Sequence, residues 1–129
     1  GAAQARGEIA LLRTAWPGAE IAVQPGLEAR LWLPDENDIH VLAAAVAGSA
    51  DAILTLNAKD FPRGLLAEEG LERMDPDSWL YEVWLGDPLM MENVGAQVLQ
   101  QARDLSGQEW EMRALLKKAR LPRLAKALS

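Results

Sequence analysis

The sequence predicts an α/β core followed by a helical C-terminal extension. An apolar, helix-like stretch at residues 39–47 is followed by the apolar run 52–56, which is typical of a strand inside a parallel sheet. Two Asp-Pro steps, at residues 75–76 and 87–88, mark helix starts, because Asp caps a helix and Pro fits its first turn. Half of the 129 residues are hydrophobic, so the chain can build a real core.

The N-terminal part is predicted to contain one helix and two short strands. Residues 3–16 have the spacing of a helix that ends before Pro17-Gly18. The apolar residues on one side of this helix are Ile9, Leu12 and Trp16. Residues 21–23 and 27–33 alternate like strands, joined by a turn with Pro-Gly chemistry. The second of them could instead be a half-turn that leads into the next helix.

The central helix has a clear start. Asp35 is a good N-cap, and Asp38 follows three residues later, where a side chain can reach back as in a capping box. The helix should end near Gly48. Residues 39–47 are apolar apart from His40, which predicts burial on most faces. Because His40 lies about 200° around the helix from Asp38, we expect it to face away and to be hydrogen-bonded in the core.

Residues that typically start or end helices divide the rest of the chain into elements. Gly70 ends a short helix, and residues 106–109 read SGQE, a capping box that should open a further helix. The expected elements are helices at residues 64–69, 76–86 and 88–105, a helix opened by the capping box that starts at Ser106, a last short helix from Pro122, and a strand at 71–74. We therefore expect residues 1–74 to form the α/β core and residues 75–129 to form a helical extension packed on it.

Composition excludes several classes of function. The absence of cysteine removes disulfides, thiol catalysis and thiolate metal sites, and it fits a reducing cytoplasm. No apolar run has the length of a membrane span, so no membrane partner is expected. The net charge of −6 argues against a surface that coats nucleic acid in general. However, residues 101–129 hold seven of the 13 basic residues and only three of the 19 acidic ones. These cations either solvate helix ends or form an edge that contacts phosphate.

Oxygen ligands dominate the remaining chemistry. With one histidine and no cysteine, the chain lacks the several nitrogen and sulfur ligands that zinc sites use. Asp35 and Asp38 precede the apolar helix, and Asn57 and Asp60 follow the apolar strand, at the edge where open α/β sheets bind ligands. Carboxylates brought together repel one another, and a hard cation such as Mg²⁺ or Mn²⁺ relieves that penalty. Taken singly, Asp35 also reads as a helix cap, Asp38 as a dipole partner, and Asn57 and Asp60 as loop residues.

Two motifs resemble the PIN-domain family. Residues 33–45 read LPDENDIHVLAAA, similar to the family pattern LPDPDDRHVLAAA, and residues 54–62 read LTLNAKDFP, similar to VTxNxxDFP. The resemblance extends through the helix start at Asp75 and covers most of the chain. It implies an α/β/α fold with a central parallel sheet. It also implies a ribonuclease that depends on Mg²⁺ or Mn²⁺, in many members the toxin of a toxin-antitoxin pair.

The resemblance assigns roles to single residues. The third family acid matches Asp38, and the strand-end site matches Asn57 and Asp60. Asp38 and Asp60 would then be catalytic, with Asn57 and Asp35 as further metal ligands. Lys59 and Arg63 flank Asp60 and are candidates for neutralising the scissile phosphate.

The sequence also departs from the family pattern. Asn37 replaces an acid and Ile39 replaces an arginine, which removes some of the usual charge. No apolar strand carrying the first family acid precedes residue 35, so the chain resembles the C-terminal two-thirds of a PIN domain and is expected to be inactive alone.

Two functions are compatible with these observations. The first is a cytoplasmic ribonuclease with RNA as substrate and an antitoxin protein as partner. The second is a non-catalytic, PIN-like interaction module. Because an incomplete sheet exposes apolar strand faces and an unpaired edge, we expect a homo-oligomer in either case.

Overall fold

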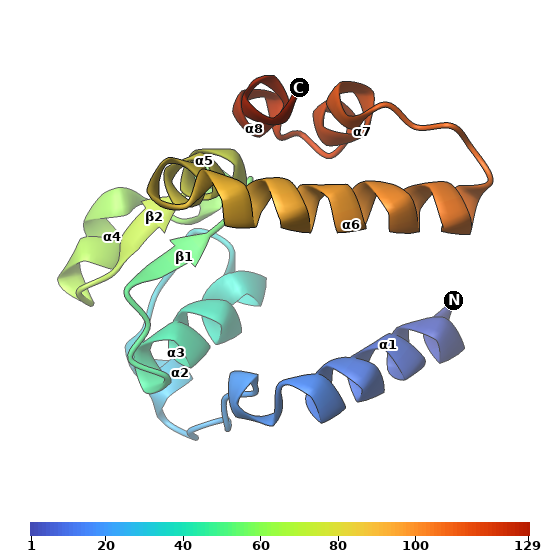
Figure 1. The fold of residues 1–129 in the computed structure, drawn as a ribbon. Coiled ribbons are helices and arrows are strands. Elements are labelled where there is room, and N and C mark those ends of the chain that lie inside the picture. Colours follow the sequence, from blue (N-terminus) through green and yellow to red (C-terminus); the bar gives the residue numbers. More distant parts are fainter. The chain divides into compact units, whose positions relative to one another are not determined.

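The computed structural model describes residues 1–129, and most of them are helical (Figure 1). The chain divides into two compact units, which we call unit 1 and unit 2. Unit 1 comprises Gly1–Ile53 and Asn57–Arg73, and unit 2 comprises Leu54–Leu56 and Met74–Ser129. Each unit has its own cluster of buried apolar side chains.

Short elements alternate in the first part of the chain. In order they are α1 (Ala2–Ala15), the 3-10 turn η1 (Pro17–Ala19), α2 (Leu27–Arg30), η2 (Glu36–Asp38), α3 (Ile39–Ala47), β1 (Ala52–Leu54), η3 (Ala58–Asp60), α4 (Arg63–Glu68) and β2 (Glu72–Met74). The predicted helices at residues 3–16 and 64–69 and the predicted strand at 71–74 are therefore present. Element ends differ from the predictions by one or two residues, which is the usual uncertainty of helix boundaries.

The sheet contains only the parallel pair β1 and β2. The backbone N–H of Glu72 donates to the carbonyl of Asp51 at 3.0 Å, and that of Thr55 donates to Met74 at 2.9 Å. From the first hydrogen bond to the second, the residue numbers rise on both strands, so the two strands are parallel. The predicted parallel pairing is therefore present, but the sheet has two strands and no further strand joins it. The strand is also less buried than predicted, because Leu54 is 44% exposed.

The two strands predicted near the N-terminus are not formed. Residues 21–23 have no regular structure, and the start of the 27–33 run is the helix α2. The alternation that suggested a strand is real at residues 31–33, where Leu31 and Leu33 are buried while Trp32 is 64% exposed. This segment alternates its side chains without joining a sheet, and a period of two does not distinguish the two cases.

Helix α3 packs through one face. Only Leu42 and Ala43 are buried in it, and His40 is exposed, so the predictions of a mostly buried helix and of a core histidine are wrong. The cause is the size of the unit 1 core, which covers a single side of α3. The helix ends at Gly48 as predicted, but the left-handed residue is Ser49, with φ of 54°. The core of unit 1 consists of Leu31, Leu33, Leu42, Ala43, Ile53, Phe61, Leu66 and Leu71.

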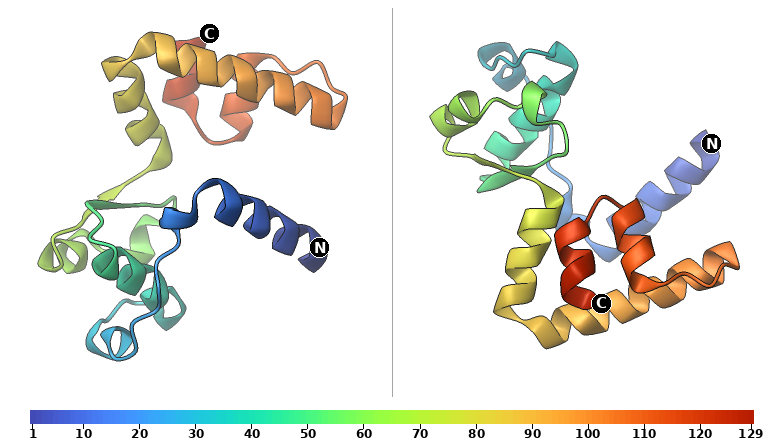
Figure 2. Two further views of the ribbon diagram at one scale, coloured as in Figure 1. Left: turned by 60° about the horizontal axis from the view of Figure 1, so that its bottom comes forward. Right: turned by 90° about the horizontal axis from the view of Figure 1, so that it is seen from above.

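Unit 2 is mostly helical (Figure 2), and its helices all lie in the part of the unit after Met74. They are α5 (Pro76–Gly86), α6 (Pro88–Ser106), α7 (Met112–Lys118) and α8 (Pro122–Leu128). Helix α8 packs against α5 and α7, and α6 contacts α5 and α7. Both Asp-Pro starts are confirmed: the Asp75 carboxylate accepts from Ser78 N–H at 2.9 Å, and the Asp87 carboxylate accepts from Met90 N–H at 3.2 Å.

The capping box predicted at residues 106–109 is not formed. Ser106 closes α6 instead, because its hydroxyl donates to the carbonyl of Ala102 and accepts from the N–H of Gln108. Gly107 follows with φ of 68°, the left-handed conformation that commonly ends a helix. The next helix, α7, begins only at Met112. The unit 2 core contains Met91, Leu116, Leu124 and Ala125, surrounded by half-buried residues that include Trp84 and Leu121.

Candidate metal centre

Three carboxylates from separate turns converge in unit 1. Oxygen atoms of Asp35, Asp38 and Asp60 all lie within 4.8 Å of one another, and all three residues are half-buried. Asp35 and Asp38 are near neighbours in sequence, but Asp60 comes later in the chain, after α3 and β1. The fold therefore brings together the three acids among the four predicted ligands, and the spacing of their oxygens is suitable for one divalent cation.

The first two carboxylates are positioned by η2. The Asp35 carboxylate accepts from the backbone N–H of Asn37 at 2.9 Å, which caps this turn. The backbone N–H of Asp38 in turn donates to the carbonyl of Asp35 at 3.0 Å. Asp38 occupies the N-cap position of α3, yet its side chain makes no capping hydrogen bond. The predicted capping-box contact is therefore absent, and the Asp38 carboxylate is left available to a ligand.

The third carboxylate is positioned by η3. The backbone N–H of Asp60 donates to the carbonyl of Asn57 at 3.3 Å, and the Asn57 amide also donates to the Asp60 carboxylate. Asn57 thus contacts the cluster through Asp60 and restrains that side chain. An asparagine amide also offers a carbonyl oxygen, a ligand type that Mg²⁺ and Mn²⁺ accept.

A residue that the sequence analysis missed holds this turn. The Arg73 guanidinium, on β2, donates to the carbonyl of Ala58 at 3.0 Å and to the carbonyl of Phe61 at 3.3 Å. Phe61 is buried in the unit 1 core, so the turn is fixed at both of its ends. The available signal was the single basic residue inside the predicted strand 71–74.

The cluster has no internal counter-charge. None of its three carboxylates forms a salt bridge, since the ion pairs of the chain are Arg13 with Glu20 and Arg30 with Glu69. Lys59 and Arg63 are both exposed, and neither forms a salt bridge with the three acids. Like charges at this separation repel one another unless a cation or protons neutralise them. The donor set of hard oxygens therefore fits a divalent cation such as Mg²⁺ or Mn²⁺.

An open hollow adjoins the acidic turn. It has a volume of about 650 Å³, and its lining includes Asp35, Asn37 and the exposed side chain of Trp32. An exposed indole beside a carboxylate cluster offers a stacking surface to a planar group. The hollow is thus large enough to receive part of a ligand next to Asp35, the one acid of the cluster that lines it.

Comparisons of the chain with known protein families, with curated proteins and with solved structures find no match. No helix combines the length and the apolar character that a membrane crossing requires.

Proposed function

We propose that this chain carries the cation site of a ribonuclease of PIN-domain type, acting in the cytoplasm on RNA. The convergence of Asp35, Asp38 and Asp60 is the single observation that carries the proposal. All three residues belong to the two motifs that resemble the family, Asp35 and Asp38 to the first and Asp60 to the second, and the chain brings the two motifs to one place. A toxin role, with an antitoxin protein as partner, extends the same proposal.

Each residue has a distinct task in the proposed site. Asp38 and Asp60 hold the cation, Asp35 adds a ligand while its other oxygen caps η2, and Asn57 orients Asp60. When bound, Mg²⁺ or Mn²⁺ polarises a phosphodiester and lowers the pKa of water. Lys59 and Arg63 are exposed next to Asp60, where they can meet the phosphate of an approaching strand.

Metal binding is the deciding test. Mn²⁺ is titrated by calorimetry into the wild type and into Asp38→Asn, Asp60→Asn and Asp51→Asn. Asp51 is an exposed acid of the same unit outside the cluster, so it controls for the loss of one charge. We expect the first two substitutions to abolish the binding heat and the third to leave it unchanged. Equal Mn²⁺ affinity in all four proteins would disprove the site.

RNA cleavage is measured beside binding, with Mn²⁺ and with EDTA. No acid in this chain matches the first acid of the family pattern, and Mg²⁺ needs most of its few carboxylates in place. We therefore expect cleavage by this chain to be weak or absent, and any cleavage to require the metal and to be lost in Asp38→Asn. Cleavage that persists in EDTA would contradict the proposed chemistry.

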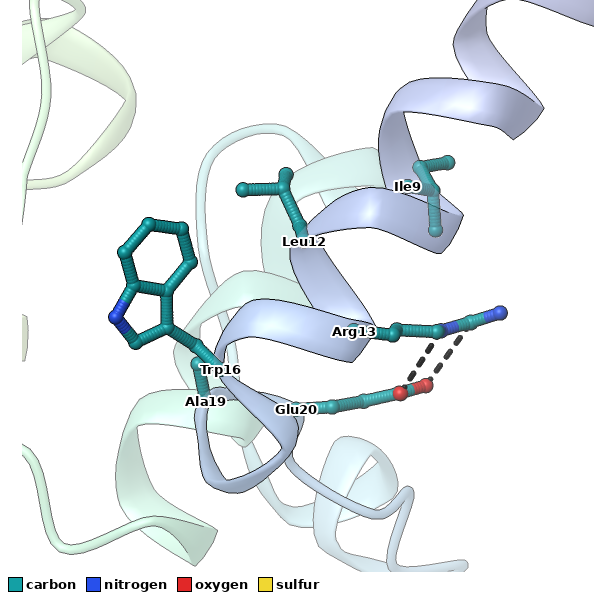
Figure 3. A pocket seen from close by; sticks show the side chains of 6 residues that line it. All are labelled: Ile9, Leu12, Arg13, Trp16, Ala19 and Glu20. Atoms are coloured by element: carbon teal, nitrogen blue, oxygen red, sulfur yellow. Dashed lines mark hydrogen bonds and ion pairs between the residues drawn. The ribbon is translucent and has the colours of Figure 1, made fainter.

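A second function, that of an interaction module, is favoured by α1. This helix has no buried residue, and Leu11, Leu12 and Trp16 are 72%, 57% and 64% exposed. Figure 3 shows Ile9, Leu12 and Trp16 together with the Arg13–Glu20 ion pair, and all five residues line a hollow of about 360 Å³. Isolated helices of this length are marginal in water, and contiguous exposed apolar side chains are typical of interaction sites.

A further inference from the structure

Unit 2 contains a cleft in which aromatic rings and cations occur together. It lies between α5 and α8, has a volume of about 370 Å³, and is lined by Tyr81, Trp84, Arg123, Lys126 and Ala127. Pockets of this size accept a small organic ligand or one unit of a polymer. No acidic side chain lines this cleft, although the whole chain carries a net charge of −6.

The rings form one half of the cleft. The centroids of Tyr81 and Trp84 are 5.6 Å apart, with the planes inclined by 32°. Both residues are half-buried, so their positions are fixed by packing while part of each ring stays accessible. The indole N–H of Trp84 is buried and has no hydrogen-bond partner. The contribution of Trp84 to the cleft is therefore its π surface.

The cations form the other half. The Arg123 guanidinium lies over the Tyr81 ring, 4.2 Å from its centroid, which presents a flat cationic plane beside the indole. Arg123 and Lys126 are exposed, and neither takes part in a salt bridge. The charge of Arg123 helps to lower the pKa of Asp75, but the Asp75 carboxylate already accepts a hydrogen bond from the backbone N–H of Ser78. Two cations are thus free to meet an external anion.

We propose that this cleft binds one nucleotide of a single-stranded nucleic acid. The base stacks on the Trp84 side, and the adjoining phosphate is held by Arg123 and Lys126. Every base offers a π face, and aromatic rings beside a cationic groove are the usual means of binding single strands without sequence preference. A duplex hides its bases inside the stack and cannot use the rings in this way.

This inference goes beyond the proposed metal-dependent cleavage. It uses only unit 2 residues and requires no cation, so it can succeed or fail independently of the acidic cluster. The test therefore uses the full chain in EDTA, where the proposed cleavage chemistry is silent. The probe is a short fluorescent single-stranded RNA, and binding is followed by anisotropy over a range of salt concentrations.

The first experiment tests the cations. Arg123→Gln and Lys126→Gln are compared singly and together with the matched pair Arg113→Gln and Lys117→Gln, which are exposed cations of α7 outside the cleft. Each cleft substitution should weaken binding and lower the log–log salt slope by about 0.7, the value for one lost phosphate contact on a single strand. An equal or larger loss in the α7 pair would overturn the proposal.

The second experiment tests the stacked base. Trp84→Phe keeps a ring in place and removes no hydrogen bond, because the indole N–H has no partner. Of the five tryptophans, Trp84 should account for the fluorescence quench on RNA binding, so the quench should disappear in Trp84→Phe while anisotropy still reports binding. Trp84→Leu should bind roughly 5- to 150-fold more weakly. An unchanged quench in Trp84→Phe would contradict stacking at this ring.

Competitors identify the source of the phosphate. We expect unlabelled single-stranded RNA to displace the probe, and a duplex of the same length or an inorganic polyphosphate of equal charge to displace it poorly. Equal displacement by polyphosphate would mean that the cleft binds phosphate charge without using the base, and it would overturn the inference. Displacement by a nucleoside monophosphate at the same concentration of nucleotide units would overturn the assignment to a strand.

Discussion

The Asp77 carboxylate joins the start of α5 to Arg123 at the start of α8. One oxygen accepts from the backbone N–H of Arg123 at 2.9 Å, and the other accepts from Leu124 N–H at 3.0 Å. Asp77 is 6% exposed, the only buried charged residue of the chain. A long-range side chain thus caps α8, whose own N-cap residue, Leu121, has no capping side chain.

Asp77→Ala is expected to lower the free energy of unfolding of unit 2 by roughly 2–3 kcal/mol. The change leaves two donors at the start of α8 without an acceptor, one of them in a buried bond. Asp87→Ala is the control, because Asp87 caps α6 on the exposed surface and should cost about 1 kcal/mol. Urea unfolding followed by circular dichroism measures both. Equal losses would show that the link to α8 adds nothing beyond an ordinary cap.

The cap that Asp75 provides at the start of α5 is expected to lose its stabilising effect in acid. The pKa of Asp75 is lowered from 3.8, first by the backbone N–H of Ser78 and then by that residue's side chain. A lowered pKa means that the folded state binds the proton less well than the unfolded state. Its contribution is therefore full above pH 3.8 and is lost as the pH falls through the folded pKa. The difference in unfolding free energy between the wild type and Asp75→Asn, which does not titrate, should narrow below that pH.

Arg73→Gln should weaken the proposed Mn²⁺ site without removing a carboxylate. Its guanidinium fixes both ends of the turn that carries Asp60, and residues that orient metal ligands typically contribute 10- to 100-fold in affinity. Arg6→Gln, an exposed substitution on α1, is the matched control. Calorimetric Mn²⁺ titration decides the matter. Unchanged affinity in Arg73→Gln would mean that the η3 turn holds its shape without this side chain.

The exposed apolar side of α1 predicts self-association. Light scattering of the wild type should give a mass above the 14.1 kDa of one chain, rising with concentration. Leu12→Glu should lower that mass, because it places a charge among the apolar residues that line the hollow of Figure 3. Leu105→Glu controls for surface charge, since Leu105 is 89% exposed on α6. A lone monomer in all three proteins would remove the homo-oligomer from consideration.

The sequence predicted those elements whose signals are local. Helix starts are marked by the capping residues Asp75 and Asp87, and a helix end is marked by Gly70. The structure has these boundaries where they were expected. Leu31 and Leu33 show the opposite case, because alternation reports which side chains are buried and not whether a partner strand exists. His40 was misplaced because the size of the core facing α3 depends on contacts that are distant in sequence.

The sequence predicted the ligand residues of the candidate site, but it did not predict the residues that hold those ligands in place. Asp35, Asp38 and Asp60 follow from carboxylate chemistry and from the two motifs. Arg73 acts through backbone carbonyls that are 12 and 15 residues away, so no spacing rule reveals it. The same holds for Asp77, whose partners lie 46 and 47 residues further along the chain.

The position of the three acids links ligand binding to thermal stability. Asp38 precedes α3 and Asp60 follows β1, so a cation bound to both would close a loop around the middle of unit 1. Such a ligand binds the folded chain in preference to the unfolded one, which adds about 2.7 kcal/mol when its concentration is 100 times the dissociation constant. Mn²⁺ would then raise the melting temperature of unit 1.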